Sequence, residues 1–452
     1  MQEKLHPSTF PELPVFTGVR QQRPLKICMA SCEFIGPIRN GGIGTAYTAM
    51  AQALIKAGHH VTLFYTQGKK CENETIAHWE NLYRKQGLRF VTRPSDSALR
   101  IDAPAHAVRS YETYRWLKNE EFDLVHFPEW GGDAYYSLLA RHQGIAFART
   151  LFCVGTHSPT AWLKEANSEL YSQPRDLEVD FMERRCVALA DFVVSPCQYM
   201  LHWMRDRGFE LPTRSFVQQN ILPRSAHRET PPEIPANRQV SEIVFFGRLE
   251  TRKGIDLFCD ALDRLISFPD LKNMRFTFMG KAATVGGRDS QAYIRSRAEK
   301  WPWSLKLLSD LDQPGAMRYL QQPGRLAVIP SLMENSPYTV LECLGSRIPF
   351  LASRVGGISE LIAPEDLEIA TFLPRAADLA DLLQRTIQSG ERAWKPAVEV
   401  NATEAAWVAW HDGLLESSAG KLFPPDDLQP EKPRVSVCVA HFNRPQMLKQ
   451  AL

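Results

Sequence analysis

The chain has 452 residues, of which 44% are hydrophobic and 23% are charged, and its formal net charge is +2. This length suggests two or three domains with cores of ordinary size, and the small net charge gives no reason to expect a nucleic-acid partner. No apolar run reaches the roughly 18 residues that a membrane-spanning helix needs, and the N-terminus lacks the basic start and apolar stretch of a signal peptide. Nine scattered cysteines without matching CxxC pairs favour a reduced, cytoplasmic location and argue against structural zinc.

The first half of the chain alternates between predicted strands and helices. Residues 1–24 are rich in proline and polar side chains and are expected to form a loose leader. The apolar runs after it predict a strand, a glycine turn, a helix and four more strands, at residues 25–31, 41–44, 45–57, 60–65, 123–127, 150–155 and 192–195. A strand, glycine turn, helix and strand in succession make a βαβ unit, which requires a parallel sheet.

A proline-rich stretch over 212–240 separates this half from a second alternating block. The elements expected there are a strand, a helix, two strands, a helix and a short strand, at residues 242–246, 254–266, 275–279, 325–330, 337–345 and 350–352. We therefore predict two facing, doubly wound α/β domains. The segments assigned are an N-terminal domain, a C-terminal domain, a terminal helix and a linker, over residues 25–215, 216–401, 402–418 and 419–433.

The first candidate for chemistry is the run Gly41-Gly42-Ile43-Gly44 between a strand and a helix. Glycines let the backbone approach a ligand closely, and a helix N-terminus favours negative charge. A tight turn needed for helix–sheet packing explains the run equally well. The spacing is not GxGxxG, so a nicotinamide cofactor is not expected.

The second candidate is Gly247-Arg248-Leu249-Glu250-Thr251-Arg252-Lys253-Gly254, which follows a predicted strand. The Arg248 guanidinium and the Lys253 ammonium would hold a diphosphate well at the carboxyl edge of a parallel sheet. Taken alone, the pattern fits a solvated basic turn better.

The third candidate contains two carboxylates, Glu334 and Glu342, around the start of a predicted helix. Ser336 is expected to be the N-cap of this helix, with Pro337 in its first position. Carboxylates accept hydrogen bonds from paired hydroxyls, so one could hold a sugar and the other a ribose. An ordinary exposed helix residue is an equally good explanation of Glu342 alone.

Together these segments resemble glycosyltransferase family 4, whose members are retaining enzymes of the GT-B fold. The resemblance covers residues 25–418 and is most specific at 331–361 and 246–254. It implies two facing Rossmann-like domains with a C-terminal helix that crosses back to the first domain.

The resemblance also implies a donor site for a nucleotide sugar. Arg248 and Lys253 would bind the pyrophosphate and stabilise the leaving group, Glu334 would contact the transferred sugar, and Glu342 would bind the ribose. The complete implied donor set is Gly41, Gly42, Gly247, Arg248, Lys253, Asn335, Ser336 and Glu342.

His157 follows a predicted strand and matches a family histidine near the reacting face of the sugar, so it joins Glu334, Arg248 and Lys253 as a catalytic candidate. Without the resemblance, a histidine satisfied in the core would be the better interpretation. Glu129 is a candidate for contact with the acceptor. Many relatives have Phe-Gly at positions 335–336, where this chain has Asn-Ser, and this departure leaves the identity of the donor open.

The implied reaction is transfer of a hexose, with retention of configuration, from a UDP- or GDP-linked sugar to a glycan or lipid-linked acceptor. The resemblance implies no metal and no cofactor beyond the nucleotide sugar. Synthesis of bacterial surface polysaccharide is the expected setting, in the cytoplasm, with peripheral contact to the inner membrane face left open. The alternative is a catalytically idle scaffold or glycan-binding domain.

Residues 434–452 carry a predicted strand followed by His441-Phe442-Asn443-Arg444-Pro445 and resemble the opening of a glycosyltransferase family 2 domain, of GT-A fold. A plain terminal strand and helix is the simpler interpretation. The resemblance implies a bifunctional polypeptide whose second transferase lies beyond residue 452.

Overall fold

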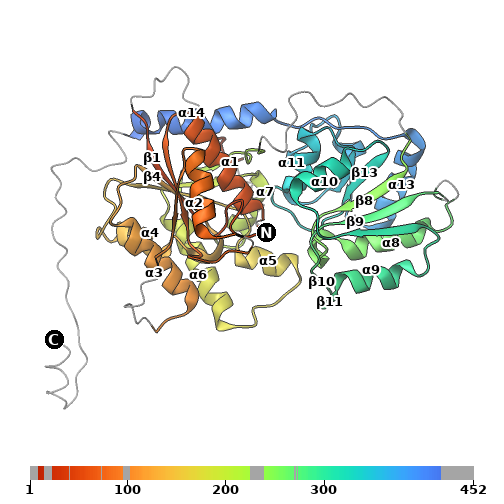
Figure 1. Cartoon of the computed structure of the whole chain (residues 1–452), viewed down its shortest axis with the longest axis horizontal. Helices are drawn as coiled ribbons and strands as arrows, with labels where there is room; N and C mark the ends of the chain where they lie inside the picture. Colours follow the sequence, from red (N-terminus) through yellow and green to blue (C-terminus); the bar gives the residue numbers. More distant parts are fainter. Residues whose placement is uncertain are drawn as a thin grey trace, which may run out of the picture.

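The computed structural model describes residues 9–14, 23–39, 41–72, 74–94, 102–223, 239–268, 271 and 273–418. Two α/β domains lie side by side along the long axis of the molecule, the first coloured red to yellow-green and the second green to blue (Figure 1). The predicted pair of facing Rossmann-like domains is therefore confirmed. The expected linker at 419–433 and the expected start of a second transferase at 434–452 lie outside the described residues.

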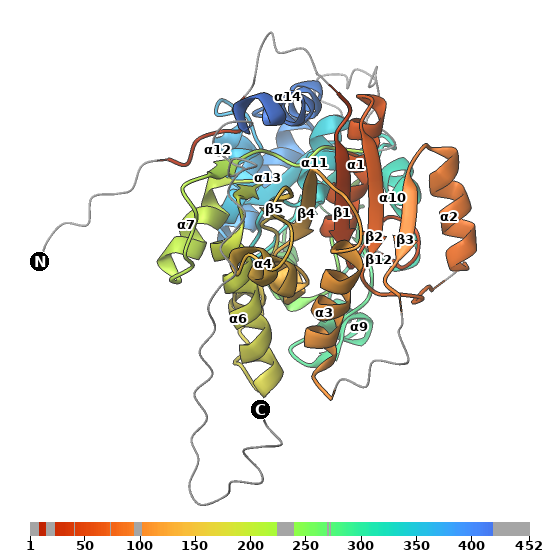
Figure 2. The ribbon, with the colours of Figure 1, turned by 90° about the vertical axis from the view of Figure 1, so that its left-hand side faces the viewer.

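The N-terminal domain has, within the described residues, a seven-stranded parallel sheet in the order β3-β2-β1-β4-β5-β6-β7. Its central strands are almost continuously apolar because helices cover both faces (Figure 2). The strands are β1 Lys26–Ser31, β2 His60–Tyr65, β3 Arg89–Thr92, β4 Leu124–Pro128, β5 Leu151–Gly155, β6 Phe192–Ser195 and β7 Ser215–Val217. The helices are α1 Gly42–Lys56, α2 Ile76–Lys85, α3 Ala105–Leu117, α4 Tyr135–His142, α5 Thr160–Ala166, α6 Pro174–Leu189 and α7 Gln198–Asp206.

The described part of the C-terminal domain has a six-stranded parallel sheet in the order β12-β9-β8-β13-β14-β15. Its strands are β8 Glu242–Phe246, β9 Arg275–Met279, β12 Ser304–Leu308, β13 Arg325–Ile329, β14 Phe350–Ser353 and β15 Thr371–Phe372, with a separate hairpin of β10 Thr284–Val285 and β11 Arg288–Asp289. The helices are α8 Ile255–Leu265, α9 Ser290–Ala298, α10 Gln313–Leu320, α11 Tyr338–Gly345, α12 Leu367–Ala370 and α13 Ala376–Ser389. None of the helices in the described ranges combines the length and apolar character needed to cross a membrane.

Three local expectations differ from the structure. The N-terminal sheet continues to Val217, two residues past the predicted boundary, and Glu12 of the predicted leader forms a β-bridge with Val217. Helix α1 begins at Gly42 rather than residue 45, because the glycine run packs as a first helical turn that leaves only Gly41 as its cap. Helix α11 begins at Tyr338 with Pro337 in the extended cap position, so the Ser336 hydroxyl caps nothing.

The last helix, α14 Val400–Ser418, packs against α1 of the N-terminal domain (Figure 1). Trp407, Trp410 and Leu414 belong to the core of that domain, and the Trp410 ring meets Phe192 of β6 edge-on, with ring centroids 5.4 Å apart. The indole nitrogen of Trp407 also donates to the Gln219 carbonyl, at 2.9 Å. The helix therefore crosses back as expected and ties the C-terminal end of the fold to the first domain.

A buried pair of histidines, His411 of this helix and His126 of β4, predicts that the protein is sensitive to acid. The Nε2 atoms of His126 and His411 lie 3.0 Å apart, and burial lowers the pKa of His126 to about 3 and that of His411 well below its usual value. In the unfolded chain both imidazoles bind a proton near pH 6.5, whereas in the folded chain they stay neutral at that pH. We therefore expect the free energy of unfolding to fall below about pH 6.5, by up to about 1.4 kcal/mol per pH unit for each histidine.

Urea unfolding at pH 7.5, 6 and 5 measures this loss, with the double variant His126→Gln/His411→Gln as comparison. Its two amides can hydrogen-bond but cannot titrate, so its stability should fall less steeply with acid than that of the wild type. Equal pH slopes for the two proteins would assign the acid sensitivity to other groups.

Candidate active site

The turn after β8 brings its basic residues against the loop that follows β13. Gly254 ends the short 3-10 helix Thr251–Lys253 with φ 78°, and a Cβ built on it would lie 1.8 Å from the Pro330 carbonyl oxygen. Only glycine combines this left-handed backbone with such a close approach. The approach places Lys253 beside Glu334, 81 positions further along the chain.

Glu334 is the centre of a buried charge cluster. The Lys253 ammonium pairs with one carboxylate oxygen, to which the Ser331 hydroxyl donates at 2.7 Å, and the Arg252 guanidinium lies 3.4 Å from the other. Burial alone would raise the pKa of Glu334, but Lys253 and Arg252 outweigh it and hold the pKa below its usual value. The cluster therefore keeps a charged carboxylate next to two cations in a water-poor site.

The two arginines of the turn differ in their exposure. Arg252, which the sequence did not single out, is 5% exposed and stacks over Trp162 of the N-terminal domain, with its guanidinium carbon 5.5 Å from the ring centroid. The side chain of Arg248 is 54% exposed and pairs with Glu250 at 3.0 Å. Lys253 and Arg252 therefore reach Glu334, while Arg248 lies at the solvent-exposed rim of the cluster.

Glu342 lies inside α11 and is almost fully buried. The side-chain amide of Gln313, at the start of α10, donates to one of its oxygens at 3.2 Å. Burial raises the pKa of Glu342 to about 7, although the Gln313 hydrogen bond opposes the shift. A buried carboxylate with so little hydrogen bonding is unusual for a structural residue and fits a site that receives hydroxyl donors from a ligand.

His157 lies on the N-terminal side of the same region, after β5. Burial lowers its pKa to about 4, so its imidazole is neutral, and its ring lies 5.7 Å from that of Tyr47. Its backbone N–H donates to Glu129 at 2.7 Å, and the Ser158 N–H donates to the same oxygen at 2.5 Å. Glu129 is fully buried and supports the His157 loop from within, and its contact with an acceptor stays a prediction.

The glycine run and Asn335 make contacts within the protein at the boundary of the two domains, and their donor-binding roles stay predictions. The Gly41 N–H donates to the Glu33 carboxylate at 2.8 Å, and Gly42 faces the Tyr338 ring across the domain boundary. Asn335 reaches the N-terminal domain, where it donates to the His157 carbonyl at 2.8 Å. The structure thus brings together the predicted catalytic residues Lys253 and Glu334, and it joins the predicted donor contact Asn335 to the backbone of His157 across the boundary.

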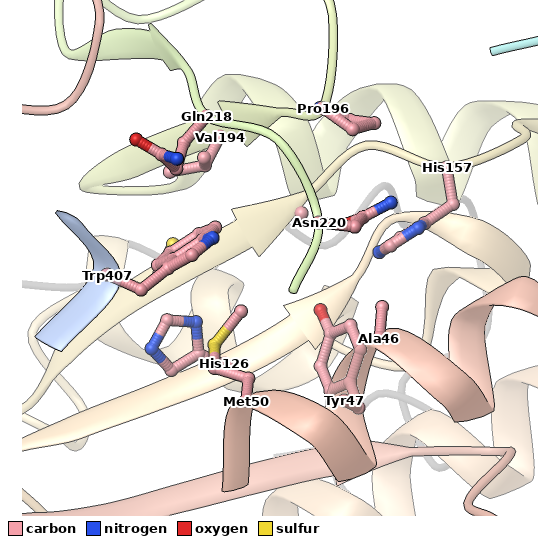
Figure 3. A pocket seen from close by; sticks show the side chains of 12 residues that line it. Ala46, Tyr47, Met50, His126, His157, Val194, Pro196, Gln218, Asn220 and Trp407 are labelled. Atoms are coloured by element: carbon pink, nitrogen blue, oxygen red, sulfur yellow. The ribbon is translucent and has the colours of Figure 1, made fainter. Parts of the chain in front are cut away.

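A small pocket lies next to His157 on the N-terminal side (Figure 3). Helix α1, strands β4 to β6 and the crossover helix form its walls, and its polar groups are Tyr47, His126, His157, Gln218 and Asn220. Across the ranges that the structure describes, no group of three or more His, Cys, Asp or Glu side chains is placed to hold a metal ion.

Two family models match this chain. The model described as Glycosyltransferase Family 4 matches residues 40–215, and the model described as Glycosyl transferases group 1 matches residues 241–389. The matches coincide with the two α/β domains, and together they cover most of the chain. Neither extends past residue 389, so the family 2 resemblance at 434–452 has no support from them and stays a prediction.

Individual relatives are distant. The chain is 24% identical over 183 residues to a D-inositol 3-phosphate glycosyltransferase of Nocardia farcinica, a match that spans 40% of this chain and 41% of that protein. It is 22% identical over 358 residues to a glycogen synthase of Mycobacterium tuberculosis, covering 75% of this chain and 80% of that protein. The solved structure of sucrose-phosphate synthase from Thermosynechococcus elongatus superposes with a TM-score of 0.59 at 17% identity, covering 88% of this chain and 95% of that one. The chain therefore carries a family 4 glycosyltransferase domain followed by a group 1 glycosyltransferase domain, in the GT-B fold.

Proposed function

We propose that the chain is a retaining, metal-independent hexosyltransferase. It takes a sugar from a UDP- or GDP-linked donor and passes it to a glycan or lipid-linked acceptor in bacterial surface polysaccharide synthesis. The donor sugar and the setting rest on the family resemblance. The cluster of Lys253, Arg252 and Glu334, in the loops after β8 and β13, supports the chemistry.

The observation that carries the proposal is the pairing of Glu334 with Lys253 and Arg252, together with a second buried carboxylate, Glu342, in the helix that follows Glu334. A nucleotide sugar combines a diphosphate with two sets of vicinal hydroxyls. Lys253, Arg252 and the rim residue Arg248 supply positive charge for the diphosphate, and the two carboxylates supply acceptors for hydroxyls. Glu342 would take the ribose and Glu334 the transferred sugar.

In the proposed reaction, the acceptor hydroxyl attacks the anomeric carbon from the face that the diphosphate leaves. The new bond joins the acceptor oxygen to that carbon, and the bond from the carbon to the diphosphate oxygen breaks. The hydroxyl proton passes to an oxygen of the departing diphosphate, so the products are the glycoside and a nucleoside diphosphate. Fixed cations at that diphosphate stabilise the charge that develops on it.

A thermal-shift panel with UDP, GDP, ADP and CDP tests the donor site first. A nucleotide at about 100 times its dissociation constant should add about 2.7 kcal/mol to the free energy of unfolding. We expect one base class to stabilise the wild type clearly and to stabilise Lys253→Met much less. If all four nucleotides left the melting temperature unchanged, the chain would be a scaffold or a glycan-binding protein instead of a nucleotide-sugar transferase.

The panel also selects the donor for transfer assays. The matching sugar nucleotide is then incubated with the protein, in the presence of a chelator, and release of the nucleoside diphosphate is followed. Loss of turnover on addition of the chelator, restored by a divalent cation, would contradict the metal-independent mechanism.

A further inference from the structure

Asn335 follows Glu334 in the same loop, and its side chain connects this loop to the N-terminal domain. Its amide nitrogen donates to the backbone carbonyls of Thr156 and His157, at 3.2 and 2.8 Å. Its amide oxygen lies 2.8 Å from the thiol sulfur of Cys197, at the start of α7. Asn335 is 6% exposed, so both amide hydrogens and the amide oxygen are engaged by the other domain.

A second contact fixes the same boundary. Glu360, at the end of the 3-10 helix Gly356–Glu360, accepts the backbone N–H groups of Gln198 and Tyr199 in the first turn of α7, at 2.7 and 2.9 Å. A carboxylate at a helix N-terminus is favoured because it satisfies N–H groups that have no partner within the helix. The C-terminal domain therefore contacts the N-terminal domain through two neighbouring side chains, Asn335 and Glu360.

The backbone of the Asn335 loop has little freedom to move. The Gly357 N–H donates to the Glu334 carbonyl at 3.2 Å, and a Cβ on Gly357 would lie 2.1 Å from the Asn335 carbonyl oxygen and 2.7 Å from the Cys197 sulfur. Only a residue without a side chain allows this packing. The position of Asn335 is thus set by the same loop that positions the Glu334 carboxylate.

The His157 peptide is held from both domains. On one side the Glu129 carboxylate of the N-terminal domain accepts its N–H, and on the other Asn335 of the C-terminal domain donates to its carbonyl. Asn335, which follows Glu334 directly in sequence, therefore links the Glu334 loop to the His157 carbonyl through a single side chain.

We propose that Asn335 is a positioning residue for the transfer reaction, and that it sets the place of His157 relative to the donor loop when the two domains are closed. This role rests on the proposed glycosyltransferase function. It also reassigns Asn335, which the sequence pattern placed among the donor contacts.

The test compares Asn335→Ala and Asn335→Asp with the wild type in nucleotide binding by calorimetry and in steady-state transfer. Asn119→Ala is the matched control, because the Asn119 amide is exposed just after α3 and donates to the Arg115 carbonyl in the last turn of that helix, at 2.9 Å. We expect the nucleotide dissociation constant of Asn335→Ala to stay within about twofold of the wild type. Its kcat should fall on the order of 100-fold, because a shift of about 1 Å in a reacting constellation has that effect.

Asn335→Asp should lower kcat further than Asn335→Ala, since a carboxylate would face two carbonyl oxygens and repel them. Retained nucleotide binding shows that the variants are folded. The proposal is overturned if Asn335→Ala weakens nucleotide binding and leaves kcat intact, which is the pattern of a donor contact, or if both parameters match the wild type. Absence of nucleotide binding in the wild type would instead refute the proposed function itself.

Discussion

Replacement of Glu342 by glutamine is expected to stabilise the free protein and to weaken its binding of nucleotide. Burial raises the pKa of Glu342 from 4.5 to about 7, so above pH 7 the folded chain carries a charge that its surroundings disfavour. A neutral amide of the same shape removes that penalty and keeps the hydrogen bond from Gln313. The expected gain in the free energy of unfolding is on the order of 3 kcal/mol at pH 8.

The sign of this effect depends on pH in a defined way. A carboxyl group whose pKa is raised on folding destabilises the fold only where the unfolded chain is ionised. The advantage of Glu342→Gln should therefore be full above about pH 7, shrink between pH 7 and 4.5, and vanish below 4.5. Urea unfolding at pH 8, 6 and 4 measures it. Glu368→Gln is the control, because the Glu368 side chain is 78% exposed. This replacement should change the free energy of unfolding little at any pH.

Nucleotide binding should respond to Glu342→Gln in the opposite direction. Ribose hydroxyls donate to the ionised carboxylate, and hydrogen bonds to charged groups contribute about 1.5–3 kcal/mol, so the dissociation constant should rise roughly 10- to 100-fold at pH 8. Binding to the wild type should weaken as pH falls below about 7, because Glu342 must then lose a proton to bind. The variant has no such group, and the phosphates titrate equally in both proteins. If the ratio of the dissociation constants of the variant and the wild type stayed constant from pH 8 to pH 5.5, Glu342 would not be part of the nucleotide site.

The sequence predicts the fold well because parallel strands covered on both faces are continuous apolar runs. Strands β2, β6, β8 and β9 have their predicted boundaries. The strands without a prediction are short or lie at sheet edges, where polar residues interrupt the pattern, as in β12, none of whose residues is fully buried. Edge strands lose the hydrophobic signal because one side of them meets water.

The site shows a similar division between local and long-range information. Lys253 and Glu334 were predicted because each follows a recognisable strand and because their segments, taken together, resemble glycosyltransferase family 4. Arg252 was missed because a basic pair in a turn normally faces solvent, whereas here its guanidinium is buried between Glu334 and Trp162, which are distant in sequence. The contact between Asn335 and His157 joins residues 178 positions apart in different domains, so no local pattern in a single sequence reveals it.

Replacement of Glu334 by glutamine should destabilise the empty protein and make nucleoside diphosphate more stabilising than it is for the wild type. The change leaves Lys253 and Arg252 buried without their shared counter-charge. Breaking a buried ion pair by removing one partner typically lowers the free energy of unfolding by about 3–5 kcal/mol. Burial already lowers the pKa of Lys253, and loss of the carboxylate should lower it further, which limits the penalty by allowing the lysine to lose its proton.

A bound diphosphate supplies the missing negative charge, and it no longer faces the Glu334 carboxylate. The nucleotide should therefore raise the melting temperature of Glu334→Gln by more than that of the wild type. Its dissociation constant from the variant should be no larger than that from the wild type. Transfer should nevertheless fall on the order of 10²- to 10³-fold, since a charged acceptor for the sugar hydroxyls is lost from the reacting centre. Thermal shift, calorimetry and initial rates on the same samples separate these effects.

The double variant Lys253→Met/Glu334→Gln completes the comparison. If the two residues act as a pair in the empty site, the double variant should be more stable than Glu334→Gln alone, because it buries one cation fewer. It should also lose the enhanced response to diphosphate, since the cation that the phosphate would pair with is gone. Equal diphosphate responses in Glu334→Gln and in the double variant would show that Lys253 does not meet the phosphate, and the donor diphosphate would then have to lie against Arg252 or Arg248.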